Sequence, residues 1–419
     1  MKKSILFLAY FYPPLGGPGV QRPIKTIKYL KKQGYNIDVL TVGDIKFHSY
    51  DEDLLKESMA DNIYRTKSFD LMYLLNKFRN SKKNNVQPKG IYFKTPERLK
   101  KIIRGLFPID DKIGWIFFAY NKALKLIKQN HYDLIIATIG PYTTAVLAYL
   151  LYKKTNIPYI IDYRDHWTLH PYPQYCFKLF HLHAKRIETK ILKNSNKIIV
   201  VSNLMKEKMI TEFGDYLRQK TSVMYNGFDE DDFININKEY SKNDGKLIIR
   251  YVGNLYGNRN VVYFIKTLEI MIEMNEIPDY IHFDFVGNYY AETIKLLKSS
   301  KVEKFITIIP QVSHRRAIEY MLSSDLLLFF VATKDGNDFI TGKIFEYIRA
   351  KRPILAMIPV NSEIEGILKD SGHKLFCAME DVQGIRNNLN MFISDPERFN
   401  EGLGYDVGYS RESQTTHFL

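Results

Sequence analysis

The chain has 419 residues, of which 45% are hydrophobic and 25% are charged, and its formal net charge is +14 at pH 7. A chain of this length exceeds one ordinary hydrophobic core, so we expect two domains. The positive charge favours an acidic partner, such as phosphate groups or an anionic membrane surface. Only two cysteines occur, Cys176 and Cys377, far apart in sequence. This excludes a disulfide framework and a zinc site, and predicts a cytoplasmic protein.

The sequence contains no helix-turn-helix, RNA-binding aromatic motif or zinc finger, so we expect no nucleic-acid partner. Two apolar segments imitate targeting signals. Residues 5–12 follow two lysines, but a proline pair comes next without a small-residue cleavage site, which favours a first strand over a signal peptide. Residues 134–152 carry no charge, yet Gly140 and Pro141 divide them into a strand and a helix. The sequence therefore predicts no transmembrane span.

The continuous apolar run 5–12 predicts a parallel strand buried on both faces. A glycine-rich segment with Gly16 and Gly17 follows it, and then a helix through Leu30. A strand that leads through glycines into a helix start lets backbone amides meet a phosphate or a sugar ring. Residues 35–42 predict the next strand, which gives the strand–helix–strand order of a doubly wound sheet.

Polar residues collect after the predicted strand 159–162, in the segment that contains Arg164 and Asp165. Open α/β sheets bind ligands at the carboxyl ends of their strands. Asp165 is therefore a candidate for binding sugar hydroxyls, and Arg164 for facing a phosphate. An equally supported alternative is a structural Asp–Arg pair that closes the loop.

The stretch from Lys77 to Arg104 is strongly basic and partly amphipathic, which indicates either a segment lying on an anionic bilayer or an exposed basic face. The acidic run 51–53 imitates a metal-binding D-x-D motif, but no buried strand precedes it, so we interpret it as a solvated loop. The polar residues 234–245 predict an exposed connector.

The second half repeats the pattern, because the strand 247–252 leads into a turn at Gly253. Further on, Thr341 suits a helix N-cap and Gly342 permits close approach of a ligand to the backbone. The free amides and positive dipole of such a helix start favour a diphosphate, and Lys343 adds a positive charge. Glu346, one turn further, suits hydrogen bonds from ribose hydroxyls. An ordinary capped helix with solvated Lys343 and Glu346 is the alternative.

The segment 338–356 resembles the nucleotide-sugar signature of the retaining family-four glycosyltransferases. There two acids separated by seven residues flank the turn, and a strand with a proline follows. Here the acids are Asp338, where the family has Glu, and Glu346, and Lys351 stands where the family usually has Gly. The glycine-rich opening, residues 162–167 and the turn 226–229 are also similar to the family.

This resemblance implies an α/β protein of the GT-B fold, with two Rossmann-like, doubly wound domains that face a cleft. Residues 1–202, joined by a crossover helix at 401–419, would form the acceptor-side domain. Residues 203–400 would form the nucleotide-sugar-binding domain.

The resemblance also implies a nucleotide-diphosphate sugar as donor, no cofactor and no metal. The leaving diphosphate would be stabilised by the helix start and by Arg259, and the transfer would retain the anomeric configuration. It assigns catalytic positions to Arg164, Asp165 and Asp338. The implied donor-binding residues are Gly16, Gly17, Gly253, Arg259, Val312, Ile340, Thr341, Gly342, Lys343 and Glu346.

The acceptor implied by family habit and charge is a glycan, or a lipid-diphosphate-linked glycan at the inner face of the cytoplasmic membrane, in cell-surface polysaccharide synthesis. Two alternatives remain open at this point. A sugar-nucleotide epimerase shares the fold and needs no acceptor. A non-catalytic partner subunit would bind the nucleotide sugar without turning it over.

Overall fold

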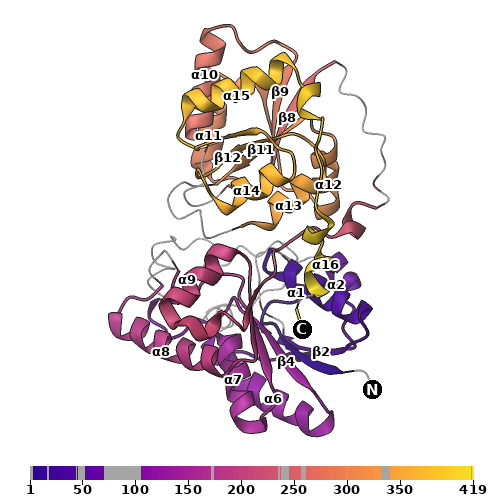
Figure 1. Cartoon of the computed structure of the whole chain (residues 1–419), viewed down its shortest axis with the longest axis vertical. Coiled ribbons are helices and arrows are strands. Elements are labelled where there is room, and N and C mark those ends of the chain that lie inside the picture. Colours follow the sequence, from indigo (N-terminus) through magenta and orange to yellow (C-terminus); the bar gives the residue numbers. More distant parts are fainter. Residues whose placement is uncertain are drawn as a thin grey trace, which may run out of the picture. The chain divides into compact units, whose positions relative to one another are not determined.

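The computed structural model describes residues 3–16, 18–43, 45, 52–69, 105–170, 174–234, 236, 245–255, 261–299, 301–331, 340–416 and 418–419 (Figure 1). The chain divides into two units, Met1–Met224 with Thr415–Leu419, and Tyr225–Gln414. Each unit has its own sheet and its own hydrophobic core, so each is described separately.

The described part of the first unit holds a seven-stranded parallel sheet in the order β3-β2-β1-β4-β5-β6-β7. The order reverses beside β1, whose Leu8 pairs with Leu40 on one side and Ala137 on the other. The central strands are apolar runs buried on both faces, as covered parallel sheets require. The strands are β1 (Ser4–Leu8), β2 (Asn36–Val42), β3 (Asn62–Thr66), β4 (Leu134–Thr138), β5 (Tyr159–Asp162), β6 (Lys197–Val200) and β7 (Thr221–Val223).

Helices connect these strands. Figure 1 shows α6, α7 and α8 in a row, and neighbouring helices in this row are in contact. Local signals fix several ends: Ser202 caps α9 by accepting a hydrogen bond from the Met205 amide, and Asn156 ends α7 in the left-handed conformation. The elements are α1 (Pro18–Lys32), α2 (Glu52–Glu57), η1 (Ile113–Trp115), α6 (Ile116–Gln129), α7 (Thr143–Thr155), α8 (Lys178–Asn194), α9 (Asn203–Phe213) and η2 (Asp215–Leu217).

The described part of the second unit holds a six-stranded parallel sheet in the order β10-β9-β8-β11-β12-β13. Its strands are β8 (Leu247–Val252), β9 (Ile281–Val286), β10 (Ile306–Ile309), β11 (Leu326–Phe330), β12 (Ile354–Met357) and β13 (Leu375–Cys377). Its helices are η3 (Glu230–Asp232), α10 (Val262–Glu273), α11 (Ala291–Ser299), η4 (Glu303–Phe305), α12 (His314–Leu322), α13 (Gly342–Arg349), α14 (Glu363–Asp370), α15 (Val382–Ser394), η5 (Glu397–Phe399) and η6 (Val407–Tyr409).

The predicted α/β class with two doubly wound parallel sheets is confirmed. The chain divides at residue 224 where the sequence predicted 202, because β7 pairs with β6 and so belongs to the first sheet. At the other end, α16 (Arg411–Thr416) contains the point where the chain returns to the first unit. Phe418 is fully buried in the core of that unit. Among the described residues, no helix has the length and apolar character needed to cross a membrane.

Candidate functional site

Arg164 follows β5 and contacts both the start of α1 and the loop after β4, at the carboxyl ends of neighbouring strands. Its Nη1 donates to the carbonyl of Gly19 at 2.9 Å, and its Nη2 to the carbonyl of Gly140 at 3.5 Å. Its Nε lies 3.4 Å from Oδ2 of Asp165. A Cβ added to Gly19 would lie 2.7 Å from Nη1, so the guanidinium packs directly against the start of α1. These are the contacts expected of the structural Asp–Arg pair that the sequence left open beside phosphate binding.

Asp165 is the more accessible partner of this pair, since its side chain is 43% exposed and that of Arg164 is 21% exposed. Both lie at the carboxyl edge of the first sheet, where the sequence placed them. Gly16 is buried at the end of the β1 loop, just before α1, and Gly17 lies outside the described residues. The first unit thus brings Gly16, Arg164 and Asp165 to loops at the same edge of one sheet.

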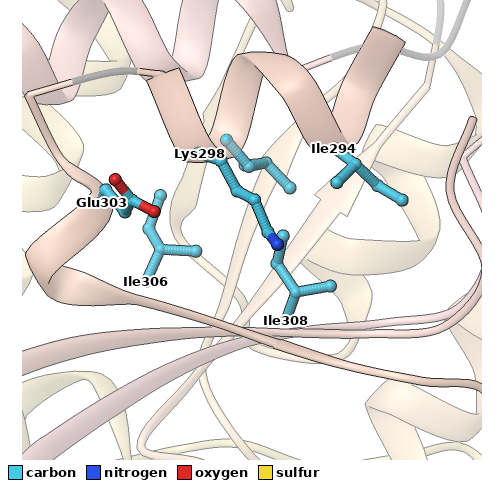
Figure 2. A pocket seen from close by; sticks show the side chains of 6 residues that line it. Ile294, Lys298, Glu303, Ile306 and Ile308 are labelled. Carbon is cyan, nitrogen blue, oxygen red and sulfur yellow. The ribbon is translucent and has the colours of Figure 1, made fainter. Parts of the chain in front are cut away.

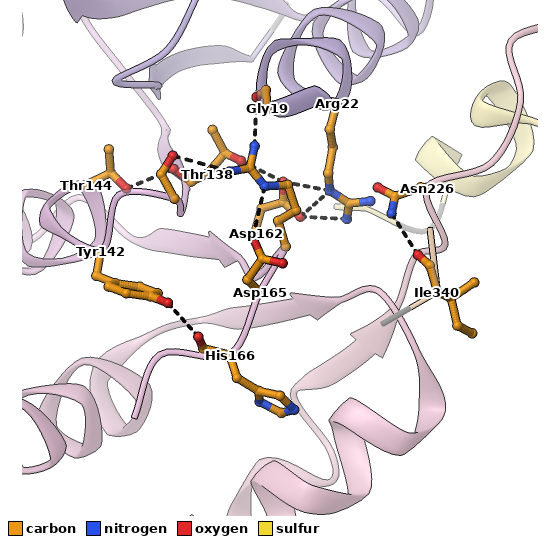
Figure 3. Close-up of polar contacts among 12 residues, drawn as sticks. Gly19, Arg22, Thr138, Tyr142, Thr144, Asp162, Asp165, His166, Asn226 and Ile340 are labelled. Atoms are coloured by element: carbon orange, nitrogen blue, oxygen red, sulfur yellow. Dashed lines mark hydrogen bonds and ion pairs between the residues drawn. The ribbon is translucent and has the colours of Figure 1, made fainter. Parts of the chain in front are cut away.

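A buried ion pair that the sequence did not indicate supports the same edge (Figure 3). Nη2 of Arg22 donates to Oδ1 of Asp162 at 2.6 Å, and Nε bridges both carboxylate oxygens at 2.9 and 3.0 Å. Thr138 donates to Oδ2 of the same carboxylate, and Nη1 of Arg22 donates to the carbonyl of Met224. These bonds join α1, β4, β5 and the end of the first unit, and bidentate geometry of this kind fixes orientation. Asp162 ends β5 and Arg22 lies in the second turn of α1, far apart in sequence.

Helix α8 also holds the loop that carries Asp165. Glu188 is buried and accepts hydrogen bonds from the hydroxyl of Tyr163 at 3.0 Å and from the amide and hydroxyl of Thr168. Burial raises the pKa of Glu188 to about 7, against the lowering effect of the hydrogen bonds from Thr168 and Tyr163. The ring of Tyr142 stacks on Trp167 with centroids 5.2 Å apart. The loop is therefore fixed on both sides of Asp165.

In the second unit, the predicted helix start is formed by α13. Thr341 occupies the N-cap position with extended backbone angles, as predicted, but its hydroxyl makes no capping hydrogen bond. The side chain of Asn226 donates to the carbonyl of Ile340 at 3.2 Å. A Cβ on Gly342 would come within 3.4 Å of the Cβ of Asn226. The turn at Asn226 therefore supports the backbone immediately before the helix. As at any helix start, the first-turn amides of α13 point away from the helix.

Lys343 extends from the first turn of α13 to the end of β8. Its Nζ lies 3.2 Å from the hydroxyl of Tyr251 and 4.4 Å from the centroid of that ring, a cation–π arrangement. Gly253 makes this possible, because a Cβ there would lie 1.7 Å from Nζ. Gly253 also has φ +139°, a conformation that L side chains rarely adopt. The structure thus brings together two predicted donor residues, Lys343 and Gly253.

The glycine turns at the ends of β8 and β9 lie very close to one another. A Cβ on Gly287 would come within 2.3 Å of the carbonyl oxygen of Gly253, so the two glycine turns are in direct contact. The Asn254 side chain accepts from the Asn288 amide at 2.9 Å. The hydroxyl of Tyr347, on α13, both accepts from the Val252 amide and donates to its carbonyl. The backbone at the end of β8 is therefore held on both sides, and the predicted Val312 packs, half-buried, on the core that contains α13.

Glu346 lies next to a histidine that sequence analysis missed. Nε2 of His314, in the first turn of α12, lies 3.2 Å from Oδ2 of Asp232 and 3.9 Å from Oε1 of Glu346. The neighbouring Glu230 accepts two hydrogen bonds from Arg349 at 2.6 and 2.7 Å. The segment after the Asn226 turn is thereby attached to α13 and to α12. No signal in the sequence connects residues so distant along the chain.

Two predicted residues of this region, Arg259 and Asp338, lie outside the described residues, as do the whole basic segment from Lys77 to Arg104 and most of the connector 234–245. The acidic run 51–53 begins in that part too, and α2 starts at Glu52. In the described ranges, no group of three or more His, Cys, Asp or Glu side chains is arranged to hold a metal ion.

A cavity of about 280 Å³ lies at the outer edge of the second sheet, between α11 and β10 (Figure 2). None of the predicted site residues lines it. Its walls are mainly apolar and come from Ile294, Leu297, Lys298, Glu303, Ile306 and Ile308.

Two parallel-sheet α/β units of this topology, with polar and glycine-rich loops at their strand ends, define the GT-B class of glycosyltransferase folds. The sequence model of the family Glycosyltransferase Family 4 matches residues 24–232, about half of the chain. The chain is a glycosyltransferase that belongs to this family. No curated protein sequence matches the chain.

Solved structures agree on the fold. A glycosyltransferase from Rickettsia africae is 16% identical with a TM-score of 0.64, over 99% of this chain and 96% of that one. HepE from Anabaena, in complex with UDP and glucose, is 15% identical with a TM-score of 0.62, over 99% and 94%. The UDP-GlcNAc 2-epimerase from Neisseria meningitidis is 14% identical with a TM-score of 0.56, over 99% and 98%.

Proposed function

We propose that this chain transfers a sugar, with retention of anomeric configuration, from a nucleotide-diphosphate sugar to a glycan or lipid-linked acceptor. The observation that carries the proposal is the start of α13, where Lys343 and Glu346 lie on a helix that begins at the Thr341–Gly342 turn. Lys343 reaches the glycine turn at the end of β8. Membership of a glycosyltransferase family supports the same reading.

The first step of the chemistry is binding of the diphosphate. The outward amides and the positive end of the α13 dipole favour an anion, and Lys343 belongs to the same first turn of the helix. During transfer, negative charge grows on the leaving diphosphate. Fixed positive groups at this place stabilise the transition state more than the ground state, without a metal. Arg259 would add a second cation.

Glu346 would bind the ribose. A carboxylate one turn into the helix accepts hydrogen bonds from two adjacent hydroxyls, while the base lies against backbone near Val312. HepE, which is similar in fold, is described in complex with UDP and glucose, and this supports a uridine nucleotide as the first donor to test.

On the acceptor side, Asp165 is the accessible carboxylate, and Arg164 and Glu188 hold its loop. We assign Asp165 to orienting an acceptor or donor hydroxyl, and Asp338 to the donor sugar. No residue is assigned as a covalent nucleophile. In the same-face mechanism, the leaving phosphate oxygen accepts the proton of the acceptor hydroxyl as the new glycosidic bond forms, so the configuration is retained.

The net charge of +14 favours an acceptor that carries a lipid diphosphate, as in capsule or lipopolysaccharide assembly at the inner face of the cytoplasmic membrane. The chain would then act as a peripheral membrane protein.

The test is a thermal-shift screen of the purified chain with UDP, GDP, ADP, CMP and their common sugars. A ligand that binds only the folded protein stabilises it by about 2.7 kcal/mol at a hundredfold excess over its dissociation constant. We expect a selective shift with one nucleotide diphosphate, and loss of that shift in Glu346→Ala with the melting temperature otherwise unchanged. No shift with any nucleotide would contradict the proposal.

The fold similarity to a UDP-GlcNAc 2-epimerase makes epimerisation the second candidate. An epimerase consumes its nucleotide sugar without an acceptor, whereas the proposed transferase requires one for turnover. Mass spectrometry of the products, with and without a glycan acceptor, separates the two activities.

A further inference from the structure

Large apolar side chains are exposed at the carboxyl edge of the first sheet. Phe177, Leu179 and Leu182, at the start of α8, are 51–69% exposed. The amino end of α8 lies at this edge because α8 follows the loop after β5. The Cys176 amide donates to the carbonyl of Gly105, so the next residue, the exposed Leu106, lies beside the same helix start. Isolated exposed apolar residues are ordinary, but a group at one edge marks an interaction surface.

A second apolar group lies at the same edge. Phe69 follows β3, and Phe117 is in the first turn of α6, so both residues lie where strands end. Their ring centroids are 6.4 Å apart, and both side chains are more than half exposed.

The charges on α8 continue the exposed stripe that begins with Leu179 and Leu182. Arg186, Lys190 and Lys193 follow at spacings of three and four residues and are exposed. Glu188 is the only acidic residue of α8, which is described throughout, and it is buried. The outer face of α8, which Figure 1 shows next to α7, therefore presents apolar side chains followed by cations.

We propose that this face, formed by Phe177, Leu179, Leu182, Arg186, Lys190 and Lys193, docks the first unit on an anionic lipid bilayer. Apolar side chains at the interface enter the headgroup region while cations attract anionic lipids, and a helix with both binds in the membrane plane. A protein partner with an acidic rim would also satisfy the cations, but the segregation of leucines and cations along one stripe favours a bilayer.

The docking proposal adds a membrane contact to the proposed function and rests on that function in one respect. The docked edge carries Asp165, so a lipid-linked acceptor would enter from the bilayer beside it. From the sequence, the candidate for membrane contact was the basic segment from Lys77 to Arg104. The α8 face is a separate surface, made wholly of described residues.

The experiment measures flotation of the full-length protein with vesicles of phosphatidylcholine alone, or of phosphatidylcholine with phosphatidylglycerol. We expect binding to the anionic vesicles to exceed binding to neutral ones by about tenfold or more. The variants Leu179→Ser/Leu182→Ser and Arg186→Ser/Lys190→Ser should each reduce anionic binding by about tenfold.

Matched controls come from exposed residues of the second unit. Val360→Ser/Met391→Ser removes two apolar side chains of similar exposed fraction, and Lys295→Ser/Lys298→Ser removes the same charge. Equal losses in α8 and control variants would overturn the proposal, as would no preference for anionic vesicles. The thermal shift with nucleotide, measured on the same variants, should be unchanged. A failure of vesicle binding with an intact shift therefore rejects the docking face and leaves the proposed function standing.

Discussion

Nζ of Lys343 lies 4.4 Å from the ring centroid of Tyr251 and 3.2 Å from its hydroxyl. The cation is thus held beside the glycine turn at Gly253, and a diphosphate bound at the start of α13 would lie within its reach. The aromatic face and the hydroxyl both favour the charged amine, so the side chain is oriented before a ligand arrives.

Lys343→Met should weaken binding of the nucleotide diphosphate by about 10- to 100-fold, because a hydrogen bond to a charged group contributes about 1.5–3 kcal/mol. Tyr251→Phe keeps the ring and loses only the hydroxyl, so its affinity should change by less than about threefold. Isothermal titration calorimetry with the nucleotide found in the thermal screen measures both. Equal affinity of Lys343→Met and the parent protein would remove the lysine from the site.

Gly253→Ala should abolish nucleotide binding and lower the melting temperature, because its Cβ would occupy the position of the Lys343 ammonium and its φ of +139° is unfavourable for alanine. Gly245→Ala is the matched control. Gly245 also has a positive φ, +78°, but nothing lies within 4 Å of its added Cβ. The control should lose stability of about 1 kcal/mol and keep its nucleotide affinity. Similar affinity losses in both variants would show that crowding of Lys343 is not the cause.

His314→Ala should reduce nucleotide affinity by about fivefold, because His314 lies between the carboxylates of Asp232 and Glu346 and fixes the one assigned to the ribose. The loss should disappear with a 2′,3′-dideoxy nucleotide, which offers Glu346 no hydroxyls. Titration of both nucleotides into both proteins gives the coupling free energy between His314 and the ribose hydroxyls directly. The same fivefold loss with the dideoxy nucleotide would assign His314 a structural role only.

The buried Glu188 should make the stability of the first unit depend on pH. Its pKa is raised from 4.5 to about 7, so the folded state binds more protons than the unfolded state between these values. The contribution of Glu188 to the free energy of unfolding is fully present below pH 4.5. It is lost as the pH rises through 7, by about 3 kcal/mol in total.

Glu188→Gln imitates the protonated side chain, so the difference in melting temperature between variant and parent should widen in favour of the variant from pH 5 to 8. The buried His373, with its pKa lowered to about 4 by burial, has the opposite slope at acidic pH but is common to both proteins. A difference that does not vary with pH would contradict the assignment.

Local sequence predicted the strands well, because β1, β4 and β8 are short apolar runs between turns. It also predicted the start of α13, from a turn followed by an amphipathic helix. It placed the domain boundary early, because β7 is a three-residue strand, Thr-Ser-Val, that carries no periodic signal. Tertiary pairing with β6 alone makes it a strand.

The candidate site was predicted where its residues are neighbours in sequence, as with Gly342, Lys343 and Glu346. The supporting contacts were not. Arg22 and Asp162 are separated by 140 residues, and Asp232 and His314 by 82. Composition and spacing report which side chains are available, but only the folded sheet decides which of them meet.

Phe418 bears on how the protein is made. It belongs to the core of the first unit, yet the ribosome synthesises it after all of residues 225–414. The first unit can form its sheet early in translation, but the space for this ring stays unfilled until the second unit has emerged. A nascent first unit therefore exposes part of its apolar interior for the whole of that interval, when chaperones would be expected to act on it.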